Sequence, residues 1–182
     1  MSKKKEADVI ILGVGTCGED LSLRLLSAGV DVIGIEADLI GGECPYWACI
    51  PSKVMIQAAE AVQKARSAAP MTGNPEVKPD WGPVAERLRW ITGGWDDSIA
   101  VERYEKRGGT MIKGRGRLTG PRTVEAGGRI YTARRGIVIA IGSIPFIPPI
   151  EGIGNIDFWT TRDIMKMETL PSSMIVLGGG AS

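Results

Sequence analysis

The chain has 182 residues, of which 43% are hydrophobic and 24% charged, and it contains three Cys and no His. This composition indicates a globular protein with one domain, or one and a fraction. The formal net charge of +1 gives no reason to expect a nucleic acid or a membrane surface as a partner, and no apolar run is long enough to span a bilayer. Three Cys without His do not suit a zinc site, and they favour a reducing compartment, so we expect a cytoplasmic protein.

The first fifty residues predict a nucleotide-binding unit. Residues 8–12 form a short apolar run, as expected of a parallel strand buried on both faces. Residues 13–18 read Gly-Val-Gly-Thr-Cys-Gly, and a helical spacing of leucines follows until Gly29. A second apolar run, 30–35, ends in Glu36. Strand, G-x-G-x-x-G, helix, strand and acid together are the fingerprint of a dinucleotide-binding βαβ unit.

Each residue of this fingerprint has an expected role. Gly13 permits the tight turn, Gly15 lets the backbone approach a pyrophosphate, and Gly18 allows close packing of helix on strand. We expect Glu36 to accept hydrogen bonds from ribose hydroxyls; the plainer alternative is a carboxylate that solvates a strand end. We expect Cys17 to be a small packed residue.

Residues 41–53 read Gly-Gly-Glu-Cys-Pro-Tyr-Trp-Ala-Cys-Ile-Pro-Ser-Lys. In an ideal helix the Cα atoms of Cys44 and Cys49 would be roughly 8–9 Å apart, whereas a disulfide needs about 4.4–6.8 Å. Pro45 favours the first helical position, which would make Cys44 the N-cap. The positive helix end and Lys53 would then stabilise thiolates, so we interpret the two cysteines as a redox pair.

Two further expectations concern this stretch. Pro51 lacks an N–H, so the helix should be kinked just after Cys49. The alternative to a redox pair is two unrelated buried cysteines that pack as small apolar residues.

The middle of the chain predicts helices. The helical face continues towards Ala69, residues 70–83 form a connection containing Pro and Gly, and a second helical region runs from about 83 to 107. We expect an interruption at residues 93–94, two glycines, and we expect the aromatic side chains Trp90 and Trp95 to pack.

After residue 110 the pattern predicts strands. Residues 111–118, 123–126 and 129–133 alternate as in a small antiparallel meander, with a hairpin signal at 126–128. Residues 136–141 return to a buried strand. Further on, we expect a strand at residues 173–177, before Gly178-Gly-Gly180. These three glycines are typical of the start of a second dinucleotide fingerprint.

The stretch 41–53 resembles the redox-active helix of class I of the FAD-dependent pyridine nucleotide-disulfide oxidoreductases, the family of dihydrolipoamide dehydrogenase, glutathione reductase and mercuric reductase. The residues that match its motif are Gly41, Gly42, Cys44, Cys49, Ile50, Pro51, Ser52 and Lys53. The chain departs from the motif at Glu43, where the family has Thr, and at Tyr46-Trp47, where its best-known members have smaller residues. A strand ending Ala140-Ile141-Gly142-Ser143 matches the family's Ala-Thr-Gly-Ser, with Ile141 in place of Thr.

The resemblance implies roles for these residues. Cys49 would lie next to the flavin as a thiolate, Cys44 would attack the substrate, and Lys53 would lie near the flavin. It also implies FAD and NAD(P)H as cofactors, a disulfide or dithiol substrate, a part in cell redox homeostasis, and a homodimer whose partner subunit supplies a catalytic His. The expected cofactor-binding residues are Gly13, Gly15, Gly18, Glu36, Gly42, Glu43, Cys44, Lys53, Gly116, Ala140, Ile141, Gly142, Ser143, Gly178 and Gly180.

We therefore expect an α/β fold in which residues 1–150 form a Rossmann-type FAD-binding domain with an inserted antiparallel meander. Residues 151–172 would be a connector, and 173–182 the first strand and incomplete glycine motif of an NAD(P)-binding domain. On this interpretation the chain is a fragment that does not turn over by itself. The alternatives are a flavin-dependent quinone-type reductase with an auxiliary dithiol, and a non-catalytic FAD-binding fragment.

Overall fold

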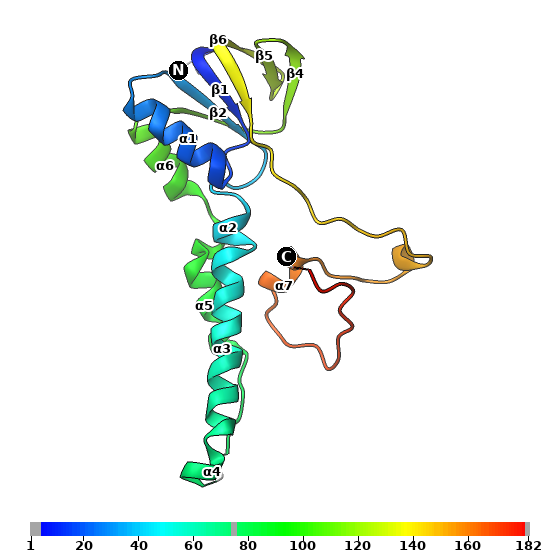
Figure 1. Ribbon diagram of the computed structural model, residues 1–182. Coiled ribbons are helices and arrows are strands. Elements are labelled where there is room, and N and C mark those ends of the chain that lie inside the picture. The colour runs from blue at the N-terminus through cyan, green and yellow to red at the C-terminus, as the bar shows by residue number, and fades with distance from the viewer. Residues whose placement is uncertain (1–4, 74–75, 181–182) are drawn as a thin grey trace. The chain divides into compact units, whose positions relative to one another are not determined.

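The computed structural model describes residues 5–73 and 76–180, and Figure 1 shows their arrangement. A six-stranded sheet has the order β3-β2-β1-β6-β5-β4, and helices accompany it, which confirms the α/β, Rossmann-type class. The strands are β1 Glu6–Leu12, β2 Val32–Glu36, β3 Thr110–Lys113, β4 Gly116–Gly120, β5 Thr123–Ala126 and β6 Arg129–Ile139. The helices are α1 Thr16–Ser27, α2 Glu43–Tyr46, α3 Cys49–Ser67, α4 Ala69–Thr72, α5 Gly82–Ile91, α6 Ser98–Lys106 and α7 Thr161–Met165, with 3-10 turns at Gly93–Trp95 and Ile153–Asn155.

The predicted βαβ unit is present. Strand β1 is parallel to β2, and α1 connects them. Ile10 and Ile11 are fully buried, as expected of a strand covered on both faces. Helix α1 ends at Ser27 with Ala28 as its C-cap, and Gly29 follows with φ of +76°, a left-handed conformation that favours glycine after a helix.

Two expectations about the later strands were wrong. Residues 111–118 do not form one strand of a meander, because the chain breaks at Gly114, where φ is +143°. Before the break, β3 pairs in parallel with β2; after it, β4 pairs antiparallel with β5. The runs 129–133 and 136–141 are joined in the single strand β6, which pairs in parallel with β1 and antiparallel with β5.

The hairpin signal was right. Gly127 and Gly128 connect β5 to β6 with φ of +56° and +71°, the combination that a two-residue type I′ turn requires. The antiparallel strands β5 and β4 extend one edge of the parallel sheet.

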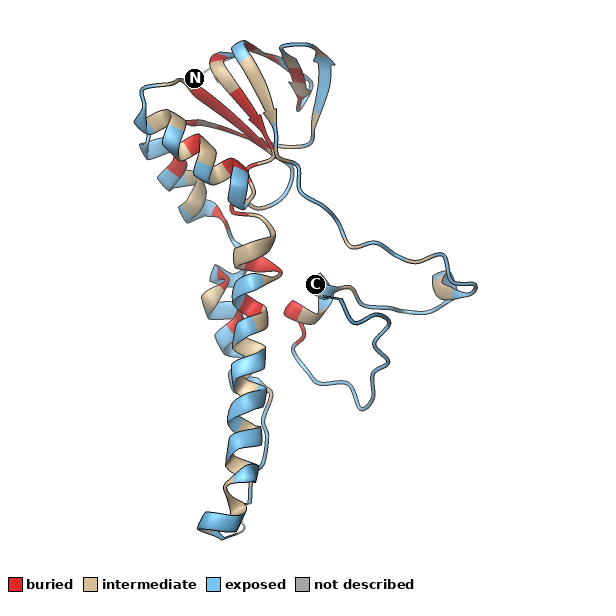
Figure 2. Cartoon of the chain, in the orientation of Figure 1, coloured by how far each residue is buried: buried red, intermediate tan, exposed pale blue. Residues whose placement is uncertain are grey.

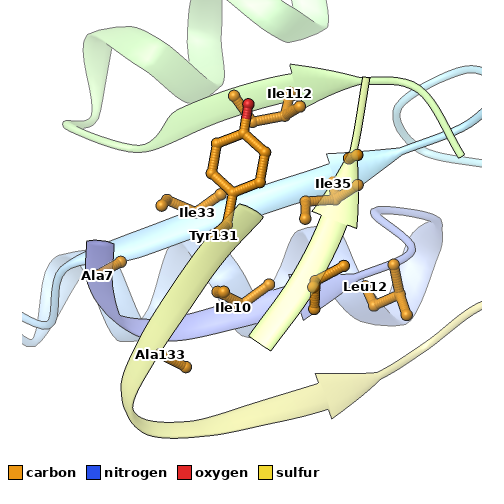
Figure 3. Packing of buried hydrophobic residues seen from close by; sticks show 10 residues of the cluster. Ala7, Ile10, Leu12, Ile33, Ile35, Ile112, Tyr131 and Ala133 are labelled. Carbon is orange, nitrogen blue, oxygen red and sulfur yellow. The ribbon is translucent and has the colours of Figure 1, made fainter. Parts of the chain in front are cut away.

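The core lies on both faces of the sheet. On one face, aliphatic side chains from β1, β2 and β3 meet Tyr131 of β6 (Figure 3). On the other face, Tyr104 of α6 and Met111 of β3 pack with Val14 and Ile40, next to apolar side chains of α1. Arg103 of α6 pairs with Glu19 of α1, so the two helices lie side by side on this face (Figure 1).

By its contacts the chain divides into two compact units, one of residues up to 43 with 95–144, the other of 44–94 with the residues from 145 on. The sheet belongs to the first unit. In the second, α3 packs along α5. The later segment is tied to α5 and the residue before it, since Trp81 Nε1 donates to the Met167 carbonyl (2.9 Å) and Arg89 pairs with Glu168 (2.7 Å).

Two predictions in the second unit were wrong. Residues 173–177 do not form a strand, because none of the described strands pairs with them; Ile175 is 88% exposed. Trp90 is not a packing group but lies on the outer face of α5, 67% exposed, with the Arg87 guanidinium 4.5 Å from its ring centroid. Figure 2 shows how much of this unit is exposed, compared with the buried strands of the sheet.

Candidate functional site

The glycine loop between β1 and α1 has no room for side chains at two of its positions. A Cβ at Gly13, where φ is +91°, would lie 2.3 Å from the Ala140 carbonyl oxygen. A Cβ at Gly18 would lie 2.0 Å from the Gly13 carbonyl oxygen. The turn and the close approach of α1 therefore both require glycine, as the sequence predicted.

Gly15 and Gly42 bring two backbone segments together. Gly15 forms a bridge with Gly41, and a Cβ at Gly42, where φ is +65°, would lie 2.8 Å from the Gly15 Cα. Gly15 is the N-cap of α1 and makes no side-chain cap. Its bare backbone and the first-turn N–H groups of α1 suit an anion such as a pyrophosphate, so this loop fits the ADP moiety of FAD.

Glu36 holds the backbone around this loop. Its Oε2 accepts a hydrogen bond from the Val14 N–H (2.6 Å), and its Oε1 accepts one from the Asp38 N–H (2.8 Å). One carboxylate thus fixes both the glycine loop and the turn after β2. Its place at the carboxyl end of β2 is compatible with the ribose contact that we expected.

Sequence reasoning missed a second support of the turn after β2. Asp97, which is 9% exposed, accepts hydrogen bonds through Oδ2 from the Ile40 N–H (2.8 Å) and from Lys113 Nζ (2.6 Å). Lys113 also donates to the Asp38 carbonyl. Asp97 directly precedes α6, a position at which Asp commonly caps a helix. Nothing local in the sequence distinguishes such a cap from a carboxylate that supports the turn after β2.

The two cysteines of the predicted pair are placed by two different helices. Cys44 lies within the short helix α2, and Cys49 is the first residue of α3. Ala48, between the helices, has φ of −135° and ψ of −93°. The predicted N-cap at Cys44 and kink after Cys49 are therefore wrong: Pro51 has no N–H to donate to Trp47, so the break falls before Cys49 instead.

Cys44 and Cys49 are both free thiols, and their side chains interact with each other. A side-chain hydrogen bond with Cys49 raises the pKa of the Cys44 thiol; burial adds to this, while Lys53 and the Cys49 backbone act in the opposite direction. This direction of the shift is opposite to the stabilised thiolate that we expected at Cys44. Lys53 Nζ donates to the Cys49 carbonyl (3.2 Å).

The third cysteine also differs from expectation. Cys17 is exposed, because the first turn of α1 directs Gly18 and Ser22 to the sheet, where both are buried. Among the described residues, no group of three or more His, Cys, Asp or Glu could hold a metal ion. Nor is any described helix long and apolar enough to cross a membrane.

The remaining residues of the expected cofactor set lie in varied surroundings. A Cβ at Gly116 would lie 2.4 Å from Leu12 Cδ1, so a larger residue here would have to displace a core side chain. Ile141 is 69% exposed, and Gly142 has φ of +65°. Glu43 begins α2, and Ser143 is exposed. Open space surrounds Gly178 and Gly180.

The glycine loop and Glu36 define a dinucleotide-binding fold. The segment that follows Gly42 carries two neighbouring thiols, Cys44 and Cys49. A sequence profile of the family described as "Pyridine nucleotide-disulphide oxidoreductase" matches residues 7–182. The chain belongs to this family. Oxidoreductases of this kind bind FAD and use NAD(P)H.

Characterised relatives carry two different names. The chain is 33% identical to the dihydrolipoyl dehydrogenase of Halobacterium salinarum and 31% identical to that of Thermus scotoductus, over 95% and 97% of its length. It is 25% identical to a mercuric reductase of Staphylococcus aureus over 95% of its length. It spans 38%, 38% and 32% of these relatives.

Proposed function

We propose that the complete protein exchanges electrons between NAD(P)H and a disulfide or dithiol substrate through FAD and the Cys44–Cys49 pair, and so resembles a dihydrolipoamide dehydrogenase. The observation that carries this proposal is the pair of interacting thiols formed by Cys44 of α2 and Cys49 at the start of α3. They follow within a few residues of Gly42, which belongs to the backbone around the glycine loop.

The residues proposed to hold the ADP moiety of FAD are Gly13, Gly15, Gly18 and Glu36. The first-turn N–H groups of α1 would bind the pyrophosphate, and Glu36 the ribose. When bound, FAD would relay the electrons of the nicotinamide to the cysteine disulfide.

The cysteines would then reduce the substrate in two exchange steps. The Cys44 sulfur attacks one sulfur of the substrate disulfide, so that a mixed disulfide forms and one substrate thiol leaves. The Cys49 sulfur next attacks the Cys44 sulfur, which releases the second thiol and leaves a Cys44–Cys49 disulfide. Because the pKa of the Cys44 thiol is raised, its proton must pass to a base as the attack begins. The resemblance suggests a His of a partner subunit.

We retain the other expectations as part of the proposal. Residues 1–150 would form the FAD-binding domain, 151–172 a connector, and 173–182 the start of an NAD(P)-binding domain, which the three consecutive glycines at 178–180 support. The complete protein would be a cytoplasmic homodimer with a part in cell redox homeostasis.

The test is to count thiols in the complete protein after anaerobic addition of NADH or NADPH. Two electrons from the nicotinamide should convert the Cys44–Cys49 disulfide into two thiols that react with a thiol reagent. Cys44→Ser and Cys49→Ser should each abolish the gain of reactive thiols and the reduction of a small disulfide. The control Cys17→Ser should abolish neither. If Cys44→Ser reduced quinones and disulfides as well as the wild type, the dithiol would be auxiliary and the proposal wrong.

A further inference from the structure

Trp47 is the largest side chain between the two cysteines, and its position is fixed. It is 6% exposed, whereas Cys49 is exposed. It lies at the break between α2 and α3, directly before the irregular residue Ala48. An indole that is fixed at this position therefore restricts the backbone that connects Cys44 to Cys49.

Two cations face the Trp47 ring. The guanidinium carbon of Arg162 lies 5.2 Å from the ring centroid, and Lys166 Nζ lies 4.8 Å from it. Both distances are within the range of cation–π attraction. Arg162 belongs to α7 and Lys166 is its C-cap, so one short helix supplies both contacts to a residue more than a hundred positions earlier.

Helix α7 is capped at its start and anchored just after its end. At its start, the Asp163 carboxylate accepts hydrogen bonds from the Thr160 N–H (2.7 Å) and hydroxyl (2.6 Å). Just after its end, the Met167 carbonyl accepts the Trp81 indole N–H, and Met167 is 9% exposed. The two cations are thus presented to Trp47 by an anchored element.

We propose that Trp47, held by Arg162 and Lys166, is a positioning residue that keeps Cys44 and Cys49 within disulfide range after their bond is broken. This inference rests on the proposed function. In the reduced state the peptide connection is the only covalent link between the two sulfurs, and a connection that moves freely lowers their effective concentration. A fixed indole in that connection keeps the dithiol ready to form the disulfide again.

The experiment measures the oxidation equilibrium of the complete protein in glutathione buffers. The two protein thiols and one glutathione disulfide give a Cys44–Cys49 disulfide and two glutathione thiols. The titration is run at pH 6 and at pH 8, because an effect of removing a cation through position should be the same at both, whereas an effect through a thiolate charge should grow at the higher pH. Trapped samples are resolved by mass spectrometry.

The double variant Arg162→Gln, Lys166→Gln should lower the equilibrium constant for disulfide formation three- to tenfold, and Trp47→Phe should lie between it and the wild type. Arg162→Lys keeps a cation and should stay within twofold of the wild type. Arg89→Gln is the matched control, since it breaks the ion pair between α5 and Glu168 without touching Trp47, and it should leave the equilibrium constant unchanged.

The outcomes separate the inference from the function on which it rests. If the wild type forms the disulfide and the double variant has the same equilibrium constant, or only a lower melting temperature, the positioning role is wrong and the proposed function stands. If the wild type forms no Cys44–Cys49 disulfide at any glutathione ratio, both are wrong. If the double variant fails to fold, Trp47→Phe and Lys166→Gln decide by the same comparison.

Discussion

Among single residues, Gly18 has the least room in the glycine loop. Gly18→Ala would place a methyl group 2.0 Å from the Gly13 carbonyl oxygen, so α1 must shift away from β1. Overpacking of this kind costs about 1–3 kcal/mol, and we expect that loss in the free energy of unfolding measured with urea. The control is Gly136→Ala in β6, where a Cβ would meet nothing within 4 Å. A Gly18→Ala protein as stable as the control would contradict the packing described here.

Glu36 allows a second prediction at this scale. Glu36→Gln keeps the shape of the side chain but offers one acceptor oxygen to two N–H groups, those of Val14 and Asp38. A hydrogen bond to a charged group contributes about 1.5–3 kcal/mol, so we expect FAD affinity to fall at least about tenfold. FMN, which lacks the adenosine, should lose less. Fluorescence titrations of both flavins measure this, with Glu60→Gln on the exposed face of α3 as control. Equal losses would contradict the role of Glu36.

At the scale of elements, the break between α2 and α3 keeps the two cysteines close. Pro51, which is buried, cannot donate to Trp47, and the first α3 hydrogen bond runs from the Ser52 N–H to the Ala48 carbonyl (3.0 Å). Pro51→Ala restores the missing donor and removes the ring that opposes a continuous helix. A continuous helix would separate the Cα atoms of Cys44 and Cys49 to roughly 8–9 Å.

We therefore expect Pro51→Ala to form less disulfide when the reduced protein is treated with a diamide oxidant. The measurement is the yield of cross-linked Cys44–Cys49 peptide, compared with Pro83→Ala, which changes an exposed proline in α5. An unchanged yield would mean that Ala48 breaks the helix without the proline.

The local elements of this fold were predictable because their signals are short in sequence. The turn at Gly13, the packing at Gly18 and the strand end at Glu36 all lie within one βαβ unit. By contrast, the alternation in residues 111–118 looks the same whether the segment is one strand or two, because the partner of β3 is β2, far back in the chain. The contacts of Trp47 with Arg162 and Lys166 could not be predicted either, because no periodicity in the sequence relates residues so far apart.

At the scale of the whole molecule, stability should depend on pH through a cluster at the amino end of the sheet. Arg134 of β6 pairs with Asp8 of β1 and with Asp31, both at 3.1 Å. A hydrogen bond from the Asp31 backbone, then Arg134 and Arg135, holds the pKa of the Asp8 carboxyl below its ordinary value of 3.8. Because the folded state favours the ionised carboxyl, the contribution of Asp8 to the free energy of unfolding is complete above about pH 4. It is lost as the pH falls through the pKa of Asp8 in the folded state, which is the lower of the two pKa values.

Asp8→Asn should therefore be less stable than the wild type at pH 7, and the difference should shrink as the pH falls from 4 to 2. Urea unfolding at several pH values measures it. The control is Asp20→Asn, which removes a carboxylate from an exposed pair within α1 and should not change the pH dependence. A difference between Asp8→Asn and wild type that stays constant down to pH 2 would contradict the assignment.

The position of β6 also determines when the sheet can form during synthesis. Strand β1, made of residues 6–12, has β6, residues 129–139, as its neighbour on one side, so the ribosome must translate most of the chain before the two can pair. Contacts so distant in sequence slow folding. Until then the unpaired edge of β1, with the apolar side chains of Ile10 and Ile11, is open to other chains. A nascent chain paused before residue 129 should therefore depend on a chaperone that covers this strand.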